Sequence, residues 1–404
     1  MKTINGGITA APGFMAAGVH CGIRRDVTKR DLALVVADSD CAAAAVYTKN
    51  RAPAAPLAVT REHLSNGRAR AILVNSGCAN ACTMGGIADA RRVCDAAAEV
   101  CGLMPSDFIV NSTGVIGVPL PTQRLVDAMP ALVTALSRDG GRAAAEAIMT
   151  TDTFRKEAAV RLEIDGKTVT VGGMAKGSGM IHSNMATMLC FLTTDCAIHP
   201  RQLQTALVNA VDRSFNRVSV DGDTSTNDMC AVLASGDAGN PMIDLENGNY
   251  GLFLEALSAV CLKLAKDIAQ DGEGATKLVT CRVTGASDEG QAVVLARSVI
   301  SSSLVKAAMF GSDANWGRVM CAMGYAGAEF DPGRVDIAFS SPAGRIPVCV
   351  KGCGLPFDED EAKRLLSRDE VTIEICLDNG AAFAEAYGCD LTYDYVKING
   401  DYRT

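Results

Sequence analysis

The sequence predicts a layered fold of the mixed α/β class, and three observations carry this prediction. Stretches of alternating polar and apolar residues occur along the 404-residue chain, and segments with apolar residues at every third or fourth position lie between them. Short strands mixed with helices of about 10 to 15 residues favour sheets covered by helices. The 39 glycines, against a single tryptophan, indicate tight turns and close backbone approaches, which suit a loop-built site on a sheet scaffold.

Three segments read as strands. Residues 279–284 (VTCRVT) and 371–376 (VTIEIC) alternate in polarity, which places their side chains on two faces in turn, as in a half-buried strand. Residues 187–194 (TMLCFLTT) are largely apolar at both alternating sets of positions, which predicts a strand buried within a dense sheet. A loop rich in glycine, serine and asparagine precedes this third strand.

Two segments read as helices. After Pro200, apolar residues recur at helical spacing through 203–211, and proline favours the first turn of a helix. A second apolar stripe runs through 254–268 and stops before the Asp-Gly-Glu-Gly sequence at 271–274. The length predicts two or three domains or one large domain, and we find no repeat and no linker that would mark a boundary.

Composition argues against several classes of protein. A net charge of −8 and a pI near 5.2 oppose binding to nucleic acid, and no basic stripe reverses this locally. The first residues contain no apolar run typical of a signal peptide, and no segment has the length and apolarity of a membrane span. We therefore expect a cytoplasmic protein without nucleic-acid or membrane partners.

The 16 cysteines are spread along the chain without a Cys-x-x-Cys motif. The nearest pairs, Cys78 with Cys82 and Cys349 with Cys353, have no further ligands close by in the sequence. We expect free, mostly buried thiols and no bound metal.

Familiar catalytic and ion-binding motifs fail on their spacing. Residues 166–168 (GKT) resemble the end of a phosphate loop, but Arg161 stands where the loop needs its first glycine. Asp221 could begin a calcium loop, but Thr226 and Val232 replace the turn glycine and the bidentate glutamate. There is no Gly-x-Ser-x-Gly sequence and there are only four histidines, so a serine hydrolase of the usual kind is disfavoured.

Thr187 stands where the glycine-rich loop meets the predicted buried strand. A threonine hydroxyl can be activated by the amine of its own residue if the preceding peptide bond, here Ala186-Thr187, has been cut. The simpler interpretation is that Thr187 is a β-branched residue that opens a strand. From the residues alone, both interpretations stay open.

Several distinctive segments follow one another along the chain: GGITAAPGF and DLALVVADSD near the start, VNSTGVIGVPLP at 110–121, KGSGMIHSNMATML at 176–189, VDGDTSTND at 220–228, GSDANWGRVMCAMGYAG at 311–327 and YVKINGDYRT at the end. In this order they resemble the ornithine acetyltransferase family. The resemblance covers nearly the whole chain, from residue 6 to residue 404. Two positions depart from the family pattern: Ser183 often corresponds to proline, and Cys78 to asparagine.

The resemblance implies a self-cleaving fold in which a new N-terminal threonine is the nucleophile. Cleavage at Ala186-Thr187 would give an α chain, 1–186, and a β chain, 187–404, which stay folded together and assemble as an α2β2 heterotetramer. Thr187 would then take the acetyl group from N2-acetylornithine and pass it to glutamate, in a ping-pong acyl transfer of arginine biosynthesis.

The resemblance also implies the remaining site residues. The oxyanion hole falls on Thr113 and Gly114, where the loss of one donor typically costs on the order of 3 kcal/mol in the barrier. The substrate contacts fall on Thr150, Lys176, Thr187, Glu273, Asn399 and Thr404. Because acetylornithine has a carboxylate and a distant ammonium, we assign Lys176 to the first and Glu273 to the second, with the direction open. Thr404 requires the end of the chain to fold back onto the core.

Three alternatives remain. The enzyme could also accept acetyl-coenzyme A as a co-substrate, since some members of the family carry out both reactions and others only the exchange; no cofactor is expected. Water could intercept the acetyl-enzyme, which would make the protein a deacylase or an aminopeptidase. A binding protein that senses metabolites of the arginine pathway would need no cleavage at all.

Overall fold

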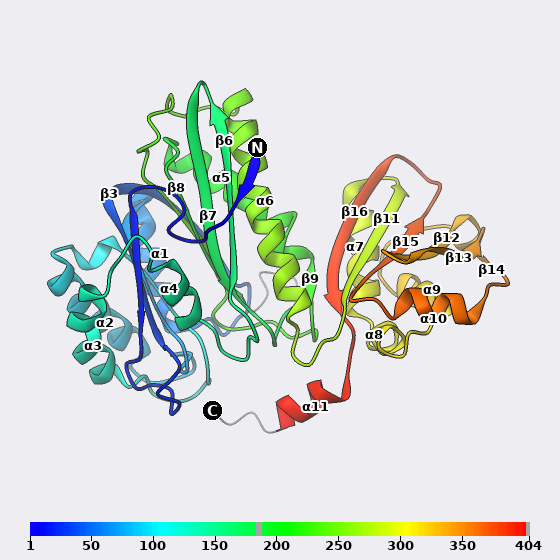
Figure 1. Ribbon diagram of the computed structural model, residues 1–404, viewed down its shortest axis with the longest axis horizontal. Coiled ribbons are helices and arrows are strands. Elements are labelled where there is room, and N and C mark those ends of the chain that lie inside the picture. The colour runs from blue at the N-terminus through cyan, green and yellow to red at the C-terminus, as the bar shows by residue number, and fades with distance from the viewer. Residues whose placement is uncertain (183–187, 401–404) are drawn as a thin grey trace.

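The computed structural model describes residues 1–182 and 188–400, and it confirms a layered mixed α/β fold (Figure 1). Two sheets, of nine and seven strands among these residues, form two lobes with helices against them. The predicted strands are confirmed at all three places. The third was predicted from residue 187; the strand begins at Leu189, and residue 187 lies outside the described residues. Ala186 and Thr187, and with them the predicted cleavage site, lie outside the described residues.

The first sheet runs in the order β1-β6-β7-β8-β10-β3-β4-β5, and β2 pairs with β3. Its strands are β1 (Lys2–Ile4), β2 (Phe14–Val19), β3 (Leu32–Tyr47), β4 (Arg68–Asn75), β5 (Phe108–Ser112), β6 (Lys156–Ile164), β7 (Lys167–Lys176), β8 (Leu189–Thr194) and β10 (Met229–Ala234). The helices of this lobe are α1 (Ala55–His63), α2 (Gly86–Cys101), α3 (Thr122–Thr134), α4 (Gly141–Ala147), α5 (Pro200–Asp212) and α6 (Gly248–Gln270).

The second sheet runs in the order β14-β13-β12-β15-β11-β16-β9. Its strands are β9 (Val218–Ser219), β11 (Leu278–Ala286), β12 (Asp336–Ser341), β13 (Gly344–Val350), β14 (Cys353–Gly354), β15 (Glu370–Cys376) and β16 (Ala382–Cys389). Its helices are α7 (Glu289–Ser301), α8 (Ser303–Phe310), α9 (Trp316–Gly324) and α10 (Glu359–Leu366), and α11 (Tyr393–Gly400) lies apart from both sheets (Figure 1). Short 3₁₀ helices occupy Leu64–Asn66, Pro105–Asp107, Phe215–Arg217 and Pro332–Arg334.

The boundary predicted at 186/187 does not separate the two sheets. Strand β7, before it, and β8, after it, are antiparallel neighbours, with Lys176 opposite Leu189. On its other side β8 pairs in parallel with β10, and every residue of β8 is buried. The segments on either side of the boundary are therefore built into one continuous sheet.

Both predicted helices are present. α5 begins at Pro200, and the side chain of His199 caps it by accepting a hydrogen bond from the Arg201 backbone N–H. α6 starts earlier than the apolar stripe, because the Asn247 side chain caps its first turn by accepting from the backbone N–H of Tyr250. It ends at Gln270, immediately before the Asp-Gly-Glu-Gly sequence, as predicted.

The stripe of α6 is the centre of the main hydrophobic core. Leu264 is completely buried in a cluster that includes side chains of β6, β7 and β8. We expect Leu264→Ala to lower the free energy of unfolding by about 2 to 5 kcal/mol, because truncation leaves a cavity in a packed core. Chemical denaturation would measure this, with Leu252→Ala as the control, since Leu252 is 43% exposed on the same helix. Equal losses in the two variants would contradict the expectation.

Two expectations drawn from the composition concern the cysteines and the possibility of a membrane span. The sixteen cysteines are free, and ten of them are buried, whereas Cys82, Cys321 and Cys353 are exposed. In the described part of the chain no single helix is long and apolar enough to span a membrane; α7 and α8 meet the criterion only as a bent pair. The apolar stripe of α7 is buried in the core of the second lobe.

Candidate active site

A cavity of about 290 Å³ lies where the loop after β5, the end of β7 and the segment after α6 come together. The predicted site residues that the structure describes all line this cavity, although they are far apart in the sequence. They are Thr113, Gly114, Thr150, Lys176, Glu273 and Asn399. Ala186, Thr187 and Thr404 lie outside the described residues, so their predicted roles stay predictions.

Thr113 and Gly114 directly follow β5 and are held by close backbone contacts. The backbone N–H of Thr113 donates to the carbonyl oxygen of Asn75 at 2.9 Å. Gly114 has φ +133°, and a Cβ atom there would lie 2.3 Å from the carbonyl carbon of Gly77. Only glycine fits this position without displacing the neighbouring loop, which fixes where the backbone of residue 114 lies.

Lys176, the last residue of β7, is only 3% exposed. Its Nζ atom donates a hydrogen bond to Oγ1 of Thr113 at 3.3 Å. Burial lowers the pKa of the Lys176 ammonium, and the negative charges of Asp152, Asp228 and Glu273 oppose this effect. The cation thus lies within hydrogen-bond distance of one of the two predicted oxyanion donors.

Glu273 and Asn399 form another part of the cavity wall. Nδ2 of Asn399 donates to Oε2 of Glu273 at 2.7 Å, so helix α11 does fold back onto the site as far as this residue. A Cβ atom on Gly179 would lie 2.3 Å from the Glu273 carboxyl carbon, so the loop after β7 packs tightly against that carboxylate. Glu273 itself is 9% exposed.

A buried ionic network beneath the cavity was not predicted. Lys156 is fully buried, and its Nζ atom lies 2.7 Å from Oδ1 of Asp152 and 2.5 Å from Oδ2 of Asp271. Asp152 also accepts from the backbone N–H groups of Gly177 (2.8 Å) and Thr150 (2.9 Å). The network therefore ties Thr150 to the loop that follows Lys176. The one sequence signal was proximity, since Asp152 and Asp271 each lie two residues from a predicted site residue.

Asp228 is a second charged residue without a predicted role. Its side chain is completely buried, and Oδ1 accepts from the backbone N–H of Met188 at 3.2 Å. Oδ2 has no hydrogen-bond partner among the described residues. Burial raises the pKa of Asp228 well above its usual value, although Lys176 acts in the opposite direction. The residue belongs to the segment VDGDTSTND at 220–228, which resembles the family but gave no predicted role to Asp228.

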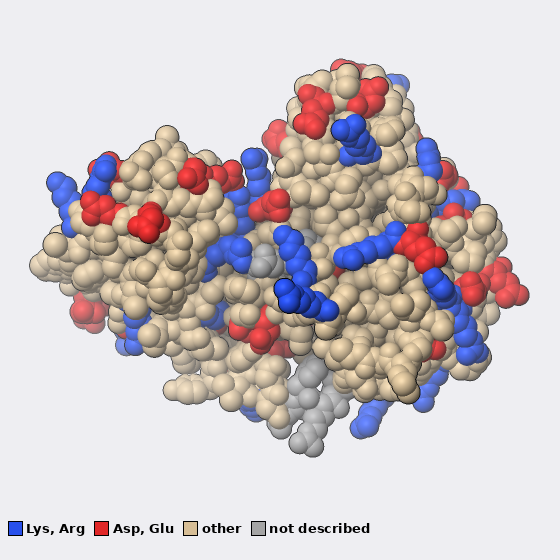
Figure 2. All heavy atoms as spheres, turned by 180° about the vertical axis from the view of Figure 1, so that it is seen from behind, with Lys and Arg blue, Asp and Glu red and all other residues tan. Residues whose placement is uncertain are grey.

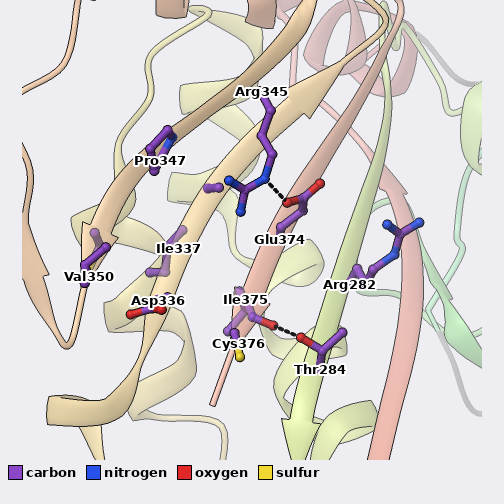
Figure 3. A pocket seen from close by; sticks show the side chains of 12 residues that line it. Arg282, Thr284, Asp336, Ile337, Arg345, Pro347, Val350, Glu374, Ile375 and Cys376 are labelled. Atoms are coloured by element: carbon purple, nitrogen blue, oxygen red, sulfur yellow. Dashed lines mark hydrogen bonds and ion pairs between the residues drawn. The ribbon is translucent and has the colours of Figure 1, made fainter. Parts of the chain in front are cut away.

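The second lobe has a separate cavity with several charged side chains in its wall. A cavity of about 430 Å³ lies on the second sheet, where Arg282, Arg345 and Glu374 are among the side chains of its wall (Figure 3). These charges are paired with neighbours on the sheet: Arg345 with Glu374, and Arg282 with Glu385, both at 2.7 Å. None of the predicted site residues that the structure describes lies there.

The rear face of the molecule is uneven in charge (Figure 2). Figure 2 shows basic side chains near the middle of the rear face, with acidic side chains on either side of them. This mixed pattern differs from the uninterrupted basic stripe expected of a nucleic-acid-binding face.

Comparison with known proteins gives one consistent result. A sequence model described as the ArgJ family matches residues 15–404. A protein of Symbiobacterium thermophilum named arginine biosynthesis bifunctional protein ArgJ is 54% identical over 406 residues, covering 100% of both chains. The protein of Clostridium acetobutylicum named arginine biosynthesis bifunctional protein ArgJ 1 is 48% identical over 401 residues, covering 99% of this chain and 98% of that one.

One solved structure adds a further likeness. The crystal structure of the ArgJ protein from Bacillus halodurans is 45% identical and covers 52% of this chain and 97% of its own, with a TM-score of 0.49.

Proposed function

The chain belongs to the ArgJ family, and from that premise we propose that it is an acyltransferase of arginine biosynthesis that moves an acetyl group from N2-acetylornithine to glutamate. The observation that carries this proposal is that all the described candidate residues, drawn from distant parts of the chain, line one cavity. This cavity adjoins the end of β7, which pairs with the strand that follows Thr187.

The nucleophile in this proposal is Thr187, freed by self-cleavage at Ala186-Thr187. Its α-amine takes the hydroxyl proton while the oxygen attacks the acetyl carbonyl carbon, and Thr113 and Gly114 donate hydrogen bonds to the oxyanion. The C–N bond then breaks, and the ammonium returns the proton to the departing amine of ornithine. Glutamate attacks the acetyl-threonine ester in the reverse sense, which yields N-acetylglutamate and regenerates the free hydroxyl.

The charge of the cavity fits a zwitterionic substrate. Within its described lining, Lys176 is the one cation and Glu273 the one carboxylate. We assign Glu273 to the δ-ammonium of acetylornithine, because a nearly buried carboxylate is stabilised when a cation docks against it. Asn399 already donates to this carboxylate, which leaves its other oxygen for the substrate.

Three further features belong to the same proposal. Relatives of this chain are named bifunctional, so we propose acetyl-coenzyme A as a second acetyl donor, with no metal or other cofactor in the reaction. We propose that the α and β chains assemble as an α2β2 heterotetramer. We place the enzyme in the cytoplasm, where its free thiols stay reduced.

An exchange assay together with N-terminal sequencing tests the proposal. Purified protein should release ornithine and N-acetylglutamate in equal amounts, and a denaturing gel should show fragments of about 19 and 23 kDa from the 42.1-kDa chain. The larger fragment should begin Thr-Met-Leu-Cys. Acetyl-coenzyme A with glutamate alone tests the second donor. Ornithine release without acetylglutamate would indicate a hydrolase, and a fully active uncut chain would refute the scheme.

A further inference from the structure

The hydrogen bond between Lys176 and Thr113 has only one possible direction while the lysine is charged. An ammonium has three N–H donors and no acceptor, so Oγ1 of Thr113 must accept from Nζ of Lys176, 3.3 Å away. The hydroxyl proton of Thr113 is then directed away from the lysine. Among the described residues, that proton has no hydrogen-bond acceptor of its own, and Thr113 lines the cavity.

Lys176 is held firmly enough to impose this direction. Its backbone ends β7, and the N–H of the next residue, Gly177, donates to Oδ1 of Asp152 at 2.8 Å. The same carboxylate is fully buried and favours the charged form of Lys176. Lys176 is 3% exposed, and Oγ1 of Thr113 is the one hydrogen-bond acceptor of its ammonium among the described residues, so leaving Thr113 would cost the ammonium that partner without access to water.

The remaining charged groups around the ammonium act in both directions. Asp228 and Glu273 favour its charged form, whereas Lys156 opposes it. Lys156 is itself compensated by Asp152 and Asp271.

We propose that Lys176, supported by Asp152, is a positioning residue that turns the Thr113 hydroxyl into a fixed donor for the oxyanion. This inference rests on the proposed acetyl transfer and gives Lys176 a task other than binding the substrate carboxylate. A donor aimed in advance stabilises developing charge without reorganisation at the moment of reaction. If Lys176 loses its proton, the neutral amine can accept from Thr113, and the hydroxyl proton turns away from the cavity.

A double-mutant cycle on the first turnover tests the proposal. Thr113→Val, Lys176→Met and the double variant are compared by the rate of ornithine release from N2-acetylornithine, on protein shown by gel to be cut. We expect Thr113→Val to slow release by about 10²-fold, and the double variant to be no slower than Thr113→Val alone. Multiplying effects would overturn the inference, because Lys176 would then act independently of Thr113.

Two matched variants separate this role from substrate binding. Thr113→Ser keeps the hydroxyl and should keep the full sensitivity to Lys176→Met. Lys176→Met should lower kcat with little change in KM, whereas a raised KM at unchanged kcat would assign Lys176 to the substrate carboxylate. A wild-type enzyme without acetyl exchange would refute the proposed function itself, so the two failures are distinguishable.

The dependence of kcat on pH is a further test, because a purely structural role of Lys176 would leave it unchanged. Because burial lowers the pKa of Lys176, we expect kcat to fall on the alkaline side below the pH at which an ordinary lysine titrates. Lys176→Arg keeps its charge at all accessible pH values, so its alkaline decline should be absent or shifted upward. Identical alkaline limbs in an active Lys176→Arg variant and the wild type would contradict the inference.

Discussion

Thr187→Ala is expected to abolish acetyl exchange and to leave the chain uncut. The substitution removes the hydroxyl that is proposed both to cut the Ala186-Thr187 bond and to carry the acetyl group. We expect a loss on the order of 10⁴-fold or more, since removal of a catalytic nucleophile typically has effects of this size. Product formation from N2-acetylornithine and glutamate measures the loss, and a denaturing gel shows the single 42.1-kDa band.

Thr187→Ser is the matched control because it keeps a hydroxyl at the same position. This variant should still be cut and should retain exchange well above that of the alanine variant. Retention of wild-type exchange by Thr187→Ala would show that another group accepts the acetyl moiety. If the uncut Thr187→Ala variant has the same circular-dichroism spectrum as the wild type, its inactivity does not come from unfolding.

Lys156→Met is expected to lower the free energy of unfolding by about 3 to 5 kcal/mol. The ammonium is fully buried between the carboxylates of Asp152 and Asp271, at 2.7 and 2.5 Å. Methionine matches the length of the lysine stem but leaves both carboxylates without their cation, and an uncompensated buried charge is strongly destabilising. Urea denaturation of the cut enzyme measures the difference, and the two chains should be followed by separate probes.

Lys263→Met is the control for this prediction. Lys263 also pairs with an aspartate, Asp267 at 2.5 Å, but its side chain is 61% exposed, so this pair should contribute less than about 1 kcal/mol. Similar losses in the two variants would show that burial of the Lys156 network does not set its energy.

The loss of unfolding free energy caused by Lys156→Met should depend on pH in one predictable direction. Although burial acts to raise it, the pKa of Asp152 is held below its usual range by Lys156 and Lys176. Its stabilising contribution is therefore present above the usual aspartate pKa, near 4, and is lost as pH falls through the lower folded value. The loss of unfolding free energy in Lys156→Met should thus keep its full size above about pH 4 and shrink only as pH falls below that value.

Local patterns were sufficient for much of the secondary structure. The apolar stripe of α6 and the proline at the start of α5 predicted both helices, because a helix repeats every 3.6 residues wherever it packs on a core. The start of α6 was missed, since its first turn depends on the cap at Asn247 rather than on an apolar residue.

The candidate site was predicted by resemblance and not by periodicity or spacing. Thr113, Lys176 and Glu273 are single polar residues without a local pattern, and such residues are usually exposed. Their convergence on one cavity follows from the order of strands in the first sheet and from the return of α11.

The chain alone thus specifies where strands and helices form, because side-chain periodicity is a property of neighbouring residues. It also carries the motifs that relate it to its family. Which charges meet is a different matter: Lys176 and Thr113 are 63 residues apart, and Lys156 and Asp271 are 115 apart. Their contacts form only after the sheet has assembled and water has been excluded. In that dry environment Lys176 can orient the Thr113 hydroxyl, and Lys156 can neutralise the two carboxylates beside it.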